Sequence, residues 1–290
     1  MDAIIGAGGH IRPNDPLAEL IPEGKTKALL PIAGKPMIQW TLDAIAGSEQ
    51  IENVIIIGLE EKHNLNCGSK TIHYLQSNET IFDNARSGCR LALKLNPEST
   101  KILWVSADLP LIETQMIDWF INQVRMSQHE LYYQIIDQDV MESRFPTSRR
   151  TYTKLKGKIV TGGDVSAINP NIATDVHPAF KKISAARKNV MKQARLLGIW
   201  PLLLLITLQM TTVTAEKIIR NRLDLDGIFV DTPYAEMGMD VDKPEQYVIA
   251  KQILEAHEGT IVASNRAPRG EGLKLVSGAR FLVRIPVARQ

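Results

Sequence analysis

The sequence predicts an α/β protein whose mostly parallel sheet is covered by helices on both faces. Short apolar runs alternate with amphipathic segments from residue 3 to residue 124, as they do in strand–helix–strand units. One run, NVIIIG at residues 53–58, is continuously apolar, which is typical of a parallel strand buried on both faces. With 290 residues, 44% hydrophobic and 23% charged, the chain is long enough for one large domain.

The elements of this first part follow from the spacing of its apolar residues. Continuous apolar runs predict strands at residues 3–7, 53–58, 71–76 and 101–108. Apolar residues three and four positions apart predict helices at residues 36–47, 81–95 and 113–124. Because strands and helices alternate, the strands are expected to lie parallel in one sheet.

The second part of the chain has a different pattern. Residues 131–170 are typical of a less regular, partly antiparallel region, interrupted by a turn at the glycine pair Gly162 and Gly163. Residues 175–223 are predicted to form a basic helical insertion that is strongly apolar near its middle.

The chain is predicted to hold one domain, residues 1–258, and a separate tail. Strand and turn patterns at 227–243 lead into a closing helix over 244–258. Residues 259–290 carry six Lys or Arg and one acid, a local charge of +5 in a chain of net charge +2, so the rest carries −3. Two alternatives stay open for this basic tail, which are a mobile, disordered segment and a stretch outside the ancestral domain.

Whole-chain charge and cysteine count exclude several classes of function. A net charge of only +2 predicts no nucleic-acid partner. Cys67 and Cys89 do not suggest a secreted disulfide framework, and no basic leader precedes the first strand, so we expect a cytoplasmic protein. The apolar run at 199–208 is about half the ~20 residues that a membrane-spanning helix needs.

The insertion leaves two interpretations open. Basic residues flank the apolar run within 185–222, with Arg187 and Lys188 before it and Arg220 and Arg222 after it. A helical hairpin here would cover an acceptor site or make a homodimer contact. An apolar patch with a basic rim would instead make peripheral contact with a membrane.

Carboxylates occur where open α/β sheets place their ligands. Asp108 follows a buried strand in the sequence SADLPLI, although a loop or helix-cap role for it stays open. Asp240 and Asp242 alternate with apolar residues in the extended segment GMDVDKPEQY, and we expect them to point to opposite faces. Only one would then face a site, while the other would form a salt bridge or cap the following helix. Asp108 and one of these two would suffice for Mg²⁺, which binds one or two carboxylates together with waters and phosphates.

Glycines and lysines complete the candidate site. The sequence AIIGAGGHIR at residues 3–12 is an apolar strand that ends in a glycine-rich turn. Lys25, Lys27 and Lys35 cluster after it, and the apolar segment ALLPIAG that follows Lys27 would hold this lysine firmly. An anchored lysine near a glycine-rich turn is suited to binding phosphate. Of the scattered histidines, His10 alone lies in this turn.

These motifs resemble, in content and order, those of nucleotidyltransferases with a MobA-like NTP transferase domain. GAGG at residues 6–9, KALLPIAGKPMIQWTLDAI, SADLPLI and DVDKPEQY follow one another across residues 1–256. The resemblance implies a Rossmann-like, GT-A-like fold, which is a three-layer α/β/α sandwich with a mostly parallel sheet. It also implies enzymatic nucleotidyl transfer, since family members join a nucleotide to molybdopterin, sugar 1-phosphates or polyol phosphates.

The resemblance assigns roles to individual residues. The residues expected to bind the nucleotide are Ala7, Gly8, Gly9, Arg12, Lys27 and Asn84. Mg²⁺ is assigned to Asp108 and Asp242, with Asp240 as the alternative second ligand, and Lys27 acts with them in catalysis. The turn formed by Gly162, Gly163 and Asp164 is expected to line the acceptor pocket.

One glycine departs from the family pattern. Gly6 stands where the family has a larger apolar residue. Because glycine loses the most conformational freedom in a strand, we expect Gly6 to cost strand order and weaken the loop that follows.

The implied reaction is an in-line attack on the α-phosphate of an NTP by a phosphate oxygen of the acceptor, with release of pyrophosphate. A phosphate nucleophile is already anionic, so positioning and charge neutralisation matter more than a general base. The expected ligands are Mg²⁺, an NTP and a small phosphorylated acceptor. The alternatives are a catalytically weak nucleotide-binding or regulatory module of the same fold, and a GT-A glycosyltransferase. The latter would have a D-x-D pair where this chain has only Asp108.

Overall fold

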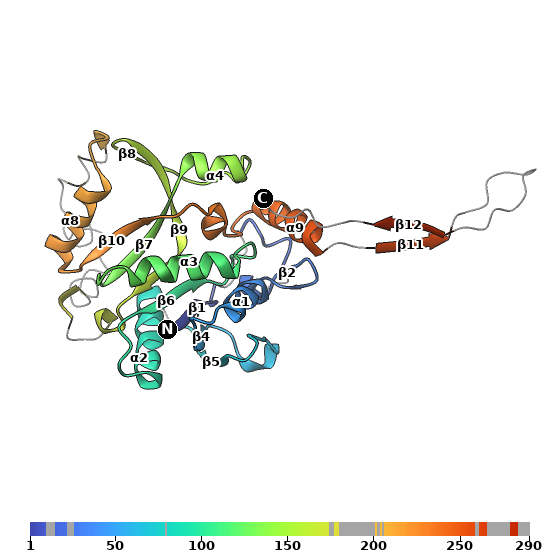
Figure 1. Ribbon diagram of the computed structural model, residues 1–290, viewed down its shortest axis with the longest axis horizontal. Helices are drawn as coiled ribbons and strands as arrows, with labels where there is room; N and C mark the ends of the chain where they lie inside the picture. Colours follow the sequence, from blue (N-terminus) through green and yellow to red (C-terminus); the bar gives the residue numbers. More distant parts are fainter. Residues whose placement is uncertain are drawn as a thin grey trace, which may run out of the picture.

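A mixed sheet of eight described strands forms the centre of the protein (Figure 1). The computed structural model describes residues 1–9, 15–21, 26–78, 80–173, 177–179, 201, 204, 206–258, 261–265 and 279–283. The parallel strands are β1 (Asp2–Gly6), β4 (Asn53–Ile57), β5 (Thr71–Leu75) and β6 (Ile102–Ser106), in the spatial order β6–β1–β4–β5. The mostly parallel sheet predicted for the first part is therefore confirmed.

Side chains of β1 show how the two faces of the sheet are covered. Ala3 and Ile5 belong to the core that α1 (Met37–Gly47) and α3 (Thr114–Arg125) cover. Ile4, between them, belongs to the opposite core, which includes α2 (Ile81–Leu95). All three side chains are fully buried, as the apolar run predicts. The three-layer α/β/α arrangement is confirmed.

The helix that leads to the candidate site begins at a defined cap. The hydroxyl of Thr80 accepts a hydrogen bond of 3.1 Å from the backbone N–H of Asp83, in the first turn of α2. This cap fixes where the chain turns from β5 into the helix, and it places Asn84 in the first turn. The range predicted for this helix, 81–95, agrees with the structure, as does that of α9 (Pro244–Glu258).

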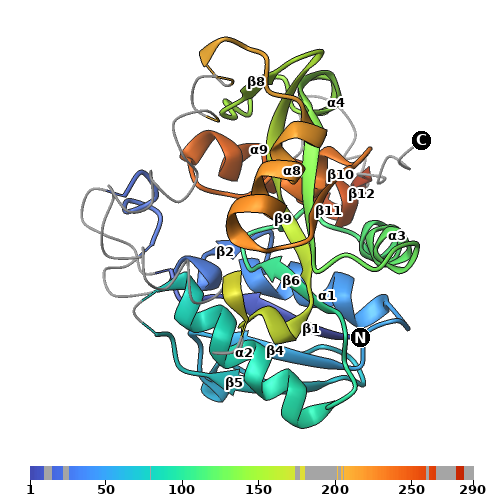
Figure 2. The ribbon, with the colours of Figure 1, turned by 90° about the vertical axis from the view of Figure 1, so that its left-hand side faces the viewer.

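The antiparallel part of the sheet lies at its other side. Its elements are β7 (Leu131–Asp137), α4 (Gln138–Arg144), β8 (Thr153–Leu155), β9 (Lys158–Ile168) and β10 (Gly227–Asp231). Strand β9 pairs with β7 along most of its length, and on its other side with β6 at one end and β8 at the other (Figure 2). Strand β10 returns parallel to β7. The partly antiparallel region predicted from the sequence is confirmed.

The turn predicted at Gly162 and Gly163 is wrong, because both glycines lie inside the continuous strand β9. The register of β7 against β9 shifts between Tyr133 and Ile135 at this point. A Cβ on Gly162 would lie 2.4 Å from the Tyr133 hydroxyl oxygen, and one on Gly163 would lie 2.8 Å from Cβ of Gln134. The glycines therefore allow side chains of β7 to approach an irregular strand closely, which is a common use of glycine in sheets.

Smaller elements complete the described chain. They are β2 (Pro31–Ile32), β3 (Lys35–Pro36), α8 (Thr212–Leu223) and the 3₁₀ helices η1 (Lys27–Leu29), η2 (Glu61–His63), η3 (Pro170–Ala173) and η4 (Ala235–Gly238). Helix α8 forms the end of the predicted helical insertion, of which residues 175–176, 180–200, 202, 203 and 205 lie outside the described residues. The membrane and homodimer roles suggested for 185–222 stay predictions. Within the described part of the chain, no helix has the length and hydropathy needed to span a bilayer.

The basic tail contains two described strands. β11 (Ile261–Asn265) and β12 (Ala279–Val283) pair antiparallel and extend away from the sheet beyond α9 (Figure 1). The rest of 259–290 lies outside the described residues. The division into a domain over 1–258 and a tail stays a prediction.

Candidate active site

The loop after β1 packs closely against the end of a neighbouring strand. The backbone N–H of Ala7 donates a 2.8 Å hydrogen bond to the Ile57 carbonyl, at the end of β4. A Cβ on Gly8 would lie 2.5 Å from Oγ of Ser77, and a Cβ on Gly58 would lie 2.3 Å from Cα of Gly8. Gly58 also has a φ of +101°, in the region that favours glycine. Because neither Gly8 nor Gly58 has a Cβ, the backbone of the loop after β1 can pack directly against the backbone after β4.

Gly58 is not among the site residues predicted from the sequence, although its position at the end of the NVIIIG run was a usable signal. Gly58→Ala is expected to lower the free energy of unfolding by about 2–4 kcal/mol, from positive-φ strain plus overpacking against Gly8. Gly34→Ala is the matched control, because Gly34 also has a positive φ, +88°, and nothing lies within 4 Å of its Cβ position. The free energies of unfolding of both variants, measured in urea, separate the cost of positive-φ strain from the cost of overpacking against Gly8. Equal losses would show that the contact between Gly8 and Gly58 contributes nothing.

Asn84 supports the same loop from the first turn of α2. Its Oδ1 accepts hydrogen bonds from the Asn78 backbone N–H at 2.6 Å and from Asn78 Nδ2 at 3.1 Å. Its Nδ2 donates at 3.4 Å to Ser77, the residue that lies against Gly8. The structure therefore links Asn84 to the glycine loop through Ser77. Its nucleotide-binding role stays a prediction.

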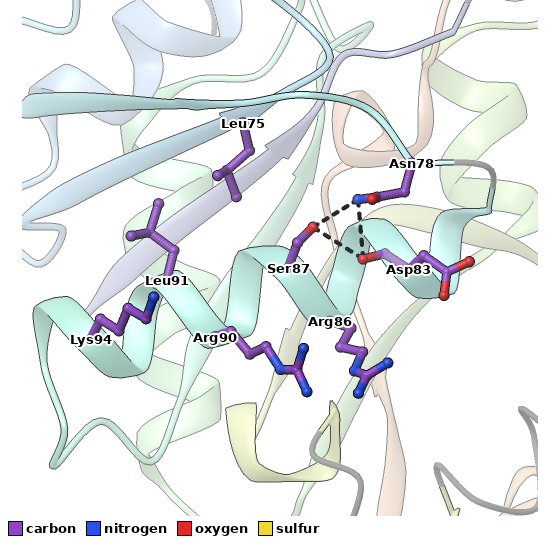
Figure 3. Close-up of a pocket in the computed structure, with 8 residues that line it drawn as sticks. All are labelled: Leu75, Asn78, Asp83, Arg86, Ser87, Arg90, Leu91 and Lys94. Atoms are coloured by element: carbon purple, nitrogen blue, oxygen red, sulfur yellow. Dashed lines mark hydrogen bonds between the residues drawn. The ribbon is translucent and has the colours of Figure 1, made fainter.

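A cavity of about 470 Å³ lies along α2, next to this link (Figure 3). The amide of Asn78 points toward the helix and donates to the Asp83 carbonyl at 3.4 Å and to Oγ of Ser87 at 3.0 Å. These hydrogen bonds attach the chain after β5 to α2. The cavity walls also include the cations Arg86, Arg90 and Lys94, but the predicted catalytic residues line a different cavity.

That second cavity, of about 330 Å³, lies between the glycine loop and the carboxyl end of β6. The residues that line it are Gly6, Ala7, Gly9, Asp15, Lys27, Ala28, Ser106, Ala107, Asp108 and Asp242. The structure therefore brings together the three predicted catalytic residues, which are far apart in the sequence. Arg12 and His10 lie outside the described residues.

Lys27 connects the glycine loop to the acidic side of the cavity. Its backbone N–H donates to the Gly9 carbonyl at 3.1 Å, and its Nζ lies 2.5 Å from Oδ2 of Asp108 and also bonds Oδ1 of Asp242. Burial lowers the pKa of Lys27, but the two carboxylates outweigh burial and hold it above its usual value. Lys27 is therefore a cation at neutral pH. Lys35 lies elsewhere, paired with Asp43 at 2.5 Å.

Asp108 is held at both carboxylate oxygens. It lies two residues beyond β6, where the hydroxyl of Ser106 donates to its Oδ1 at 2.5 Å and Lys27 binds its Oδ2. The backbone N–H of Val241 donates to the Asp108 carbonyl at 3.1 Å. This last bond ties the segment that carries Asp240 and Asp242 to the end of the central strand.

The prediction that Asp240 and Asp242 point to opposite faces is wrong. Carboxylate oxygens of both residues and of Asp108 all lie within 4.8 Å of one another. Only successive side chains of an extended segment point to opposite faces, and residues two positions apart, such as Asp240 and Asp242, share one face. At the start of α9, Oε1 of Gln246 accepts from the backbone N–H groups of Asp242 at 2.9 Å and Lys243 at 2.8 Å, while Oδ1 of Asp242 bonds Nζ of Lys27.

Asp164 adds a fourth carboxylate nearby. Its Oδ2 is buried, has no hydrogen-bond partner among the described residues, and lies 3.6 Å from Nη2 of Arg150. Burial raises the pKa of Asp164 to about 6, opposed by Arg150 and reinforced by the charges of Asp108 and Asp242. Asp164 is therefore coupled electrostatically to the cavity. The acceptor-pocket role of Gly162, Gly163 and Asp164 stays a prediction.

Gly6, the departure from the family pattern, lies at the end of β1 against an aromatic ring. A Cβ on Gly6 would lie 3.3 Å from Cζ2 of Trp104 on β6. Gly6 still pairs with Ile57 on one side and Ser106 on the other. The Trp104 ring therefore occupies space that a larger residue at position 6 would need.

Several solved structures share this architecture. A hypothetical transferase from Thermus thermophilus is 25% identical, with a TM-score of 0.68, over 85% of this chain and 99% of that one. The 4-diphosphocytidyl-2C-methyl-D-erythritol synthase of Anaerococcus prevotii is 13% identical, with a TM-score of 0.53, over 88% and 95% of the two chains. A CMP:2-keto-3-deoxy-manno-octonic acid synthetase, solved with CTP, is 13% identical, with a TM-score of 0.52, over 87% and 98%. At 13% identity the last two establish the fold alone.

Sequence comparisons agree with the fold. A curated relative, the 3-deoxy-manno-octulosonate cytidylyltransferase of Zea mays, is 23% identical over 123 residues. The match covers 42% of this chain and 41% of the relative, so the chain matches less than half of that protein's length. The family model of the MobA-like NTP transferase domain matches residues 22–188, which is more than half of the chain and includes Lys27, Asn84, Asp108 and Asp164. The chain belongs to the family of MobA-like NTP transferase domains.

Proposed function

We propose that this protein is a Mg²⁺-dependent nucleotidyltransferase that moves an NMP from an NTP to a small phosphorylated acceptor and releases pyrophosphate. The observation that carries the proposal is the cavity between the glycine loop and β6, where Lys27 binds both Asp108 and Asp242. The backbone of the glycine loop, the Lys27 cation and the two carboxylates therefore line the same cavity. Transfer of a charged phosphoryl group requires groups of these kinds, placed to stabilise its charge.

The donor set fits a magnesium ion. Asp108 and Asp242 both offer carboxylate oxygens to the cavity, and these oxygens lie within 4.8 Å of each other. Mg²⁺ prefers oxygen ligands and keeps several positions for water and substrate phosphates, so two carboxylates suffice. When bound there, Mg²⁺ would supply neutralisation of charge on the reacting phosphates.

The chain's own residues have separable parts in the reaction. The backbone of Ala7, Gly8 and Gly9 would hold the nucleotide against the end of β1. Lys27 would stabilise negative charge that develops on the phosphates as the acceptor oxygen bonds to the α-phosphorus and the bond to pyrophosphate breaks. Ser106 would keep Asp108 in one orientation through its 2.5 Å hydrogen bond. The acceptor would approach from the side of Asp164.

A pyrophosphate-release screen tests the proposal. ATP, CTP, GTP and UTP are each combined with Mg²⁺ and a panel of sugar 1-phosphates, polyol phosphates and a 3-deoxy sugar acid. CTP is tested first, because the curated maize relative is named a cytidylyltransferase. We expect release that needs Mg²⁺ and both substrates, and that disappears in Asp108→Ala.

The same screen decides between the proposal and its alternatives. If pyrophosphate is released only when the acceptor is the sugar acid, the nucleophile is a hydroxyl group and not a phosphate oxygen. NTP binding without release across the panel would favour a nucleotide-binding module. Release that persists in Asp108→Ala would contradict the assignment of the site.

A further inference from the structure

A buried arginine lies behind the acidic cluster. Arg150 belongs to the segment between α4 and β8, and its side chain is 13% exposed. Its Nη1 bonds Oδ1 of Asp240, and its Nη2 donates to the Gly162 carbonyl at 3.1 Å and lies 3.6 Å from Oδ2 of Asp164. Arg150 therefore joins two carboxylates that flank the candidate site.

The backbone that carries Arg150 is attached to the segment that carries Asp240. Arg149 has a φ of +51°, a left-handed conformation that persists in a non-glycine residue only where its surroundings fix it. Nη1 of Arg149 pairs with Oε1 of Glu245 at 3.0 Å, and Nζ of Lys243 donates to the Arg149 carbonyl at 3.0 Å. These contacts hold the guanidinium of Arg150 in place against Asp240.

The two acids after η4 differ in their surroundings. The Asp240 side chain is 12% exposed and paired with Arg150, whereas the Asp242 side chain is 60% exposed and lines the cavity. Distance alone would let Asp108, Asp240 and Asp242 bind one ion together. A third carboxylate would take a position on Mg²⁺ that a substrate phosphate otherwise fills.

We propose that Arg150 is a positioning residue that keeps Asp240 out of the metal's ligand set, so that Asp108 and Asp242 alone supply carboxylates. The guanidinium pairs with Asp240 and neutralises it, and neither residue is among those that line the cavity. Positions on the ion thereby stay available to substrate. This inference rests on the proposed metal site.

Mn²⁺ binding to the full-length protein without nucleotide tests the inference independently of turnover. We expect Asp108→Asn and Asp242→Asn each to weaken Mn²⁺ affinity by at least about 10-fold, as loss of a ligand does, and Asp240→Asn to change it by less than about 3-fold. A loss in Asp240→Asn equal to that in Asp242→Asn would overturn the role of Arg150 and leave the metal site standing. An affinity that none of the three variants changes would overturn both the metal site and this inference.

Removal of the Arg150 guanidinium is expected to strengthen Mn²⁺ binding, whereas removal of a ligand carboxylate weakens it. Arg150→Gln should free Asp240 as a third ligand and strengthen Mn²⁺ binding by about 10-fold, whereas Arg150→Lys should stay near the wild-type value. Adding Asp240→Asn to Arg150→Gln should restore the wild-type affinity. Adding Asp164→Asn changes the net charge by the same amount but leaves Asp240 in place, so the stronger binding should persist.

The double variants separate ligation from charge and from folding. Equal reversal by Asp240→Asn and Asp164→Asn would show that Arg150 acts only through its charge. Weaker binding in Arg150→Gln, with no restoration by Asp240→Asn, would show a merely structural role. Either outcome would overturn the proposal. Circular dichroism and thermal unfolding confirm that each variant is folded, and the Asp240→Asn single variant retains Arg150 and tests the inference on its own.

Discussion

Asp108→Asn is expected to lower the rate of nucleotidyl transfer by about 10²- to 10³-fold, the range found when one group that stabilises the transition state is removed. Asparagine keeps the size of the side chain and its bond from Ser106 but loses the negative charge that would hold Mg²⁺. The loss should appear in kcat at saturating NTP and Mg²⁺. Pyrophosphate release measures it directly.

Asp43→Asn is the matched control for this variant. Asp43 also pairs with a lysine, Lys35, at 2.5 Å, but neither residue is among those that line the cavity. Asp43→Asn should retain full activity. An Asp108→Asn variant with more than half of the wild-type rate would rule out a catalytic role for this carboxylate.

Lys27→Met is expected to lower kcat by about 10²-fold, because it removes the ammonium group that contacts both predicted metal ligands, Asp108 and Asp242. The wild-type rate should not fall through deprotonation of Lys27 between pH 7 and 9. The carboxylates of Asp108 and Asp242 outweigh burial and hold its pKa above the usual 10.5, so the lysine keeps its proton over this range. The variant should therefore be slower by the same factor at every pH in the range.

Two further variants complete the test of Lys27. Lys27→Arg keeps the charge and should recover part of the rate, whereas Lys35→Met removes a paired lysine outside the cavity and should have no effect. A rate in Lys27→Met that matches wild type at pH 9 but not at pH 7 would show that Lys27 loses its proton within this range, and would contradict the account. Initial-rate pH profiles of the variants provide the comparison.

Local patterns in the sequence predicted the scaffold well. Apolar runs located β1, β4 and β6, and the helical spacing of residues 81–95 gave the bounds of α2, because burial on a sheet imposes these periods on the sequence. Lys27, Asp108 and Asp242 were predicted to share a site, and the structure brings them into direct contact. In each case the relevant signal lies within a short stretch of chain.

The features that the sequence did not predict depend on contacts between distant segments. The backbone bond from Val241 to Asp108 brings Asp240 and Asp242 to the end of the central strand, where carboxylate oxygens of the three acids lie within 4.8 Å of one another. The glycines of β9 accommodate side chains of β7, so they mark a strand irregularity and not a turn. Arg150 lies 90 residues before its partner Asp240, and no pattern near it indicates that it is buried.

We expect the cavity between the glycine loop and Asp108 to bind an NTP together with a divalent cation. Calorimetric titration of each NTP, with CTP first, tests it without knowledge of the acceptor. We predict saturable binding by the full-length protein that requires Mg²⁺, weakens at least about 10-fold in Asp108→Asn and is unchanged in Asp43→Asn. Binding that is indifferent to both Mg²⁺ and Asp108, or no binding of any NTP, would contradict the account.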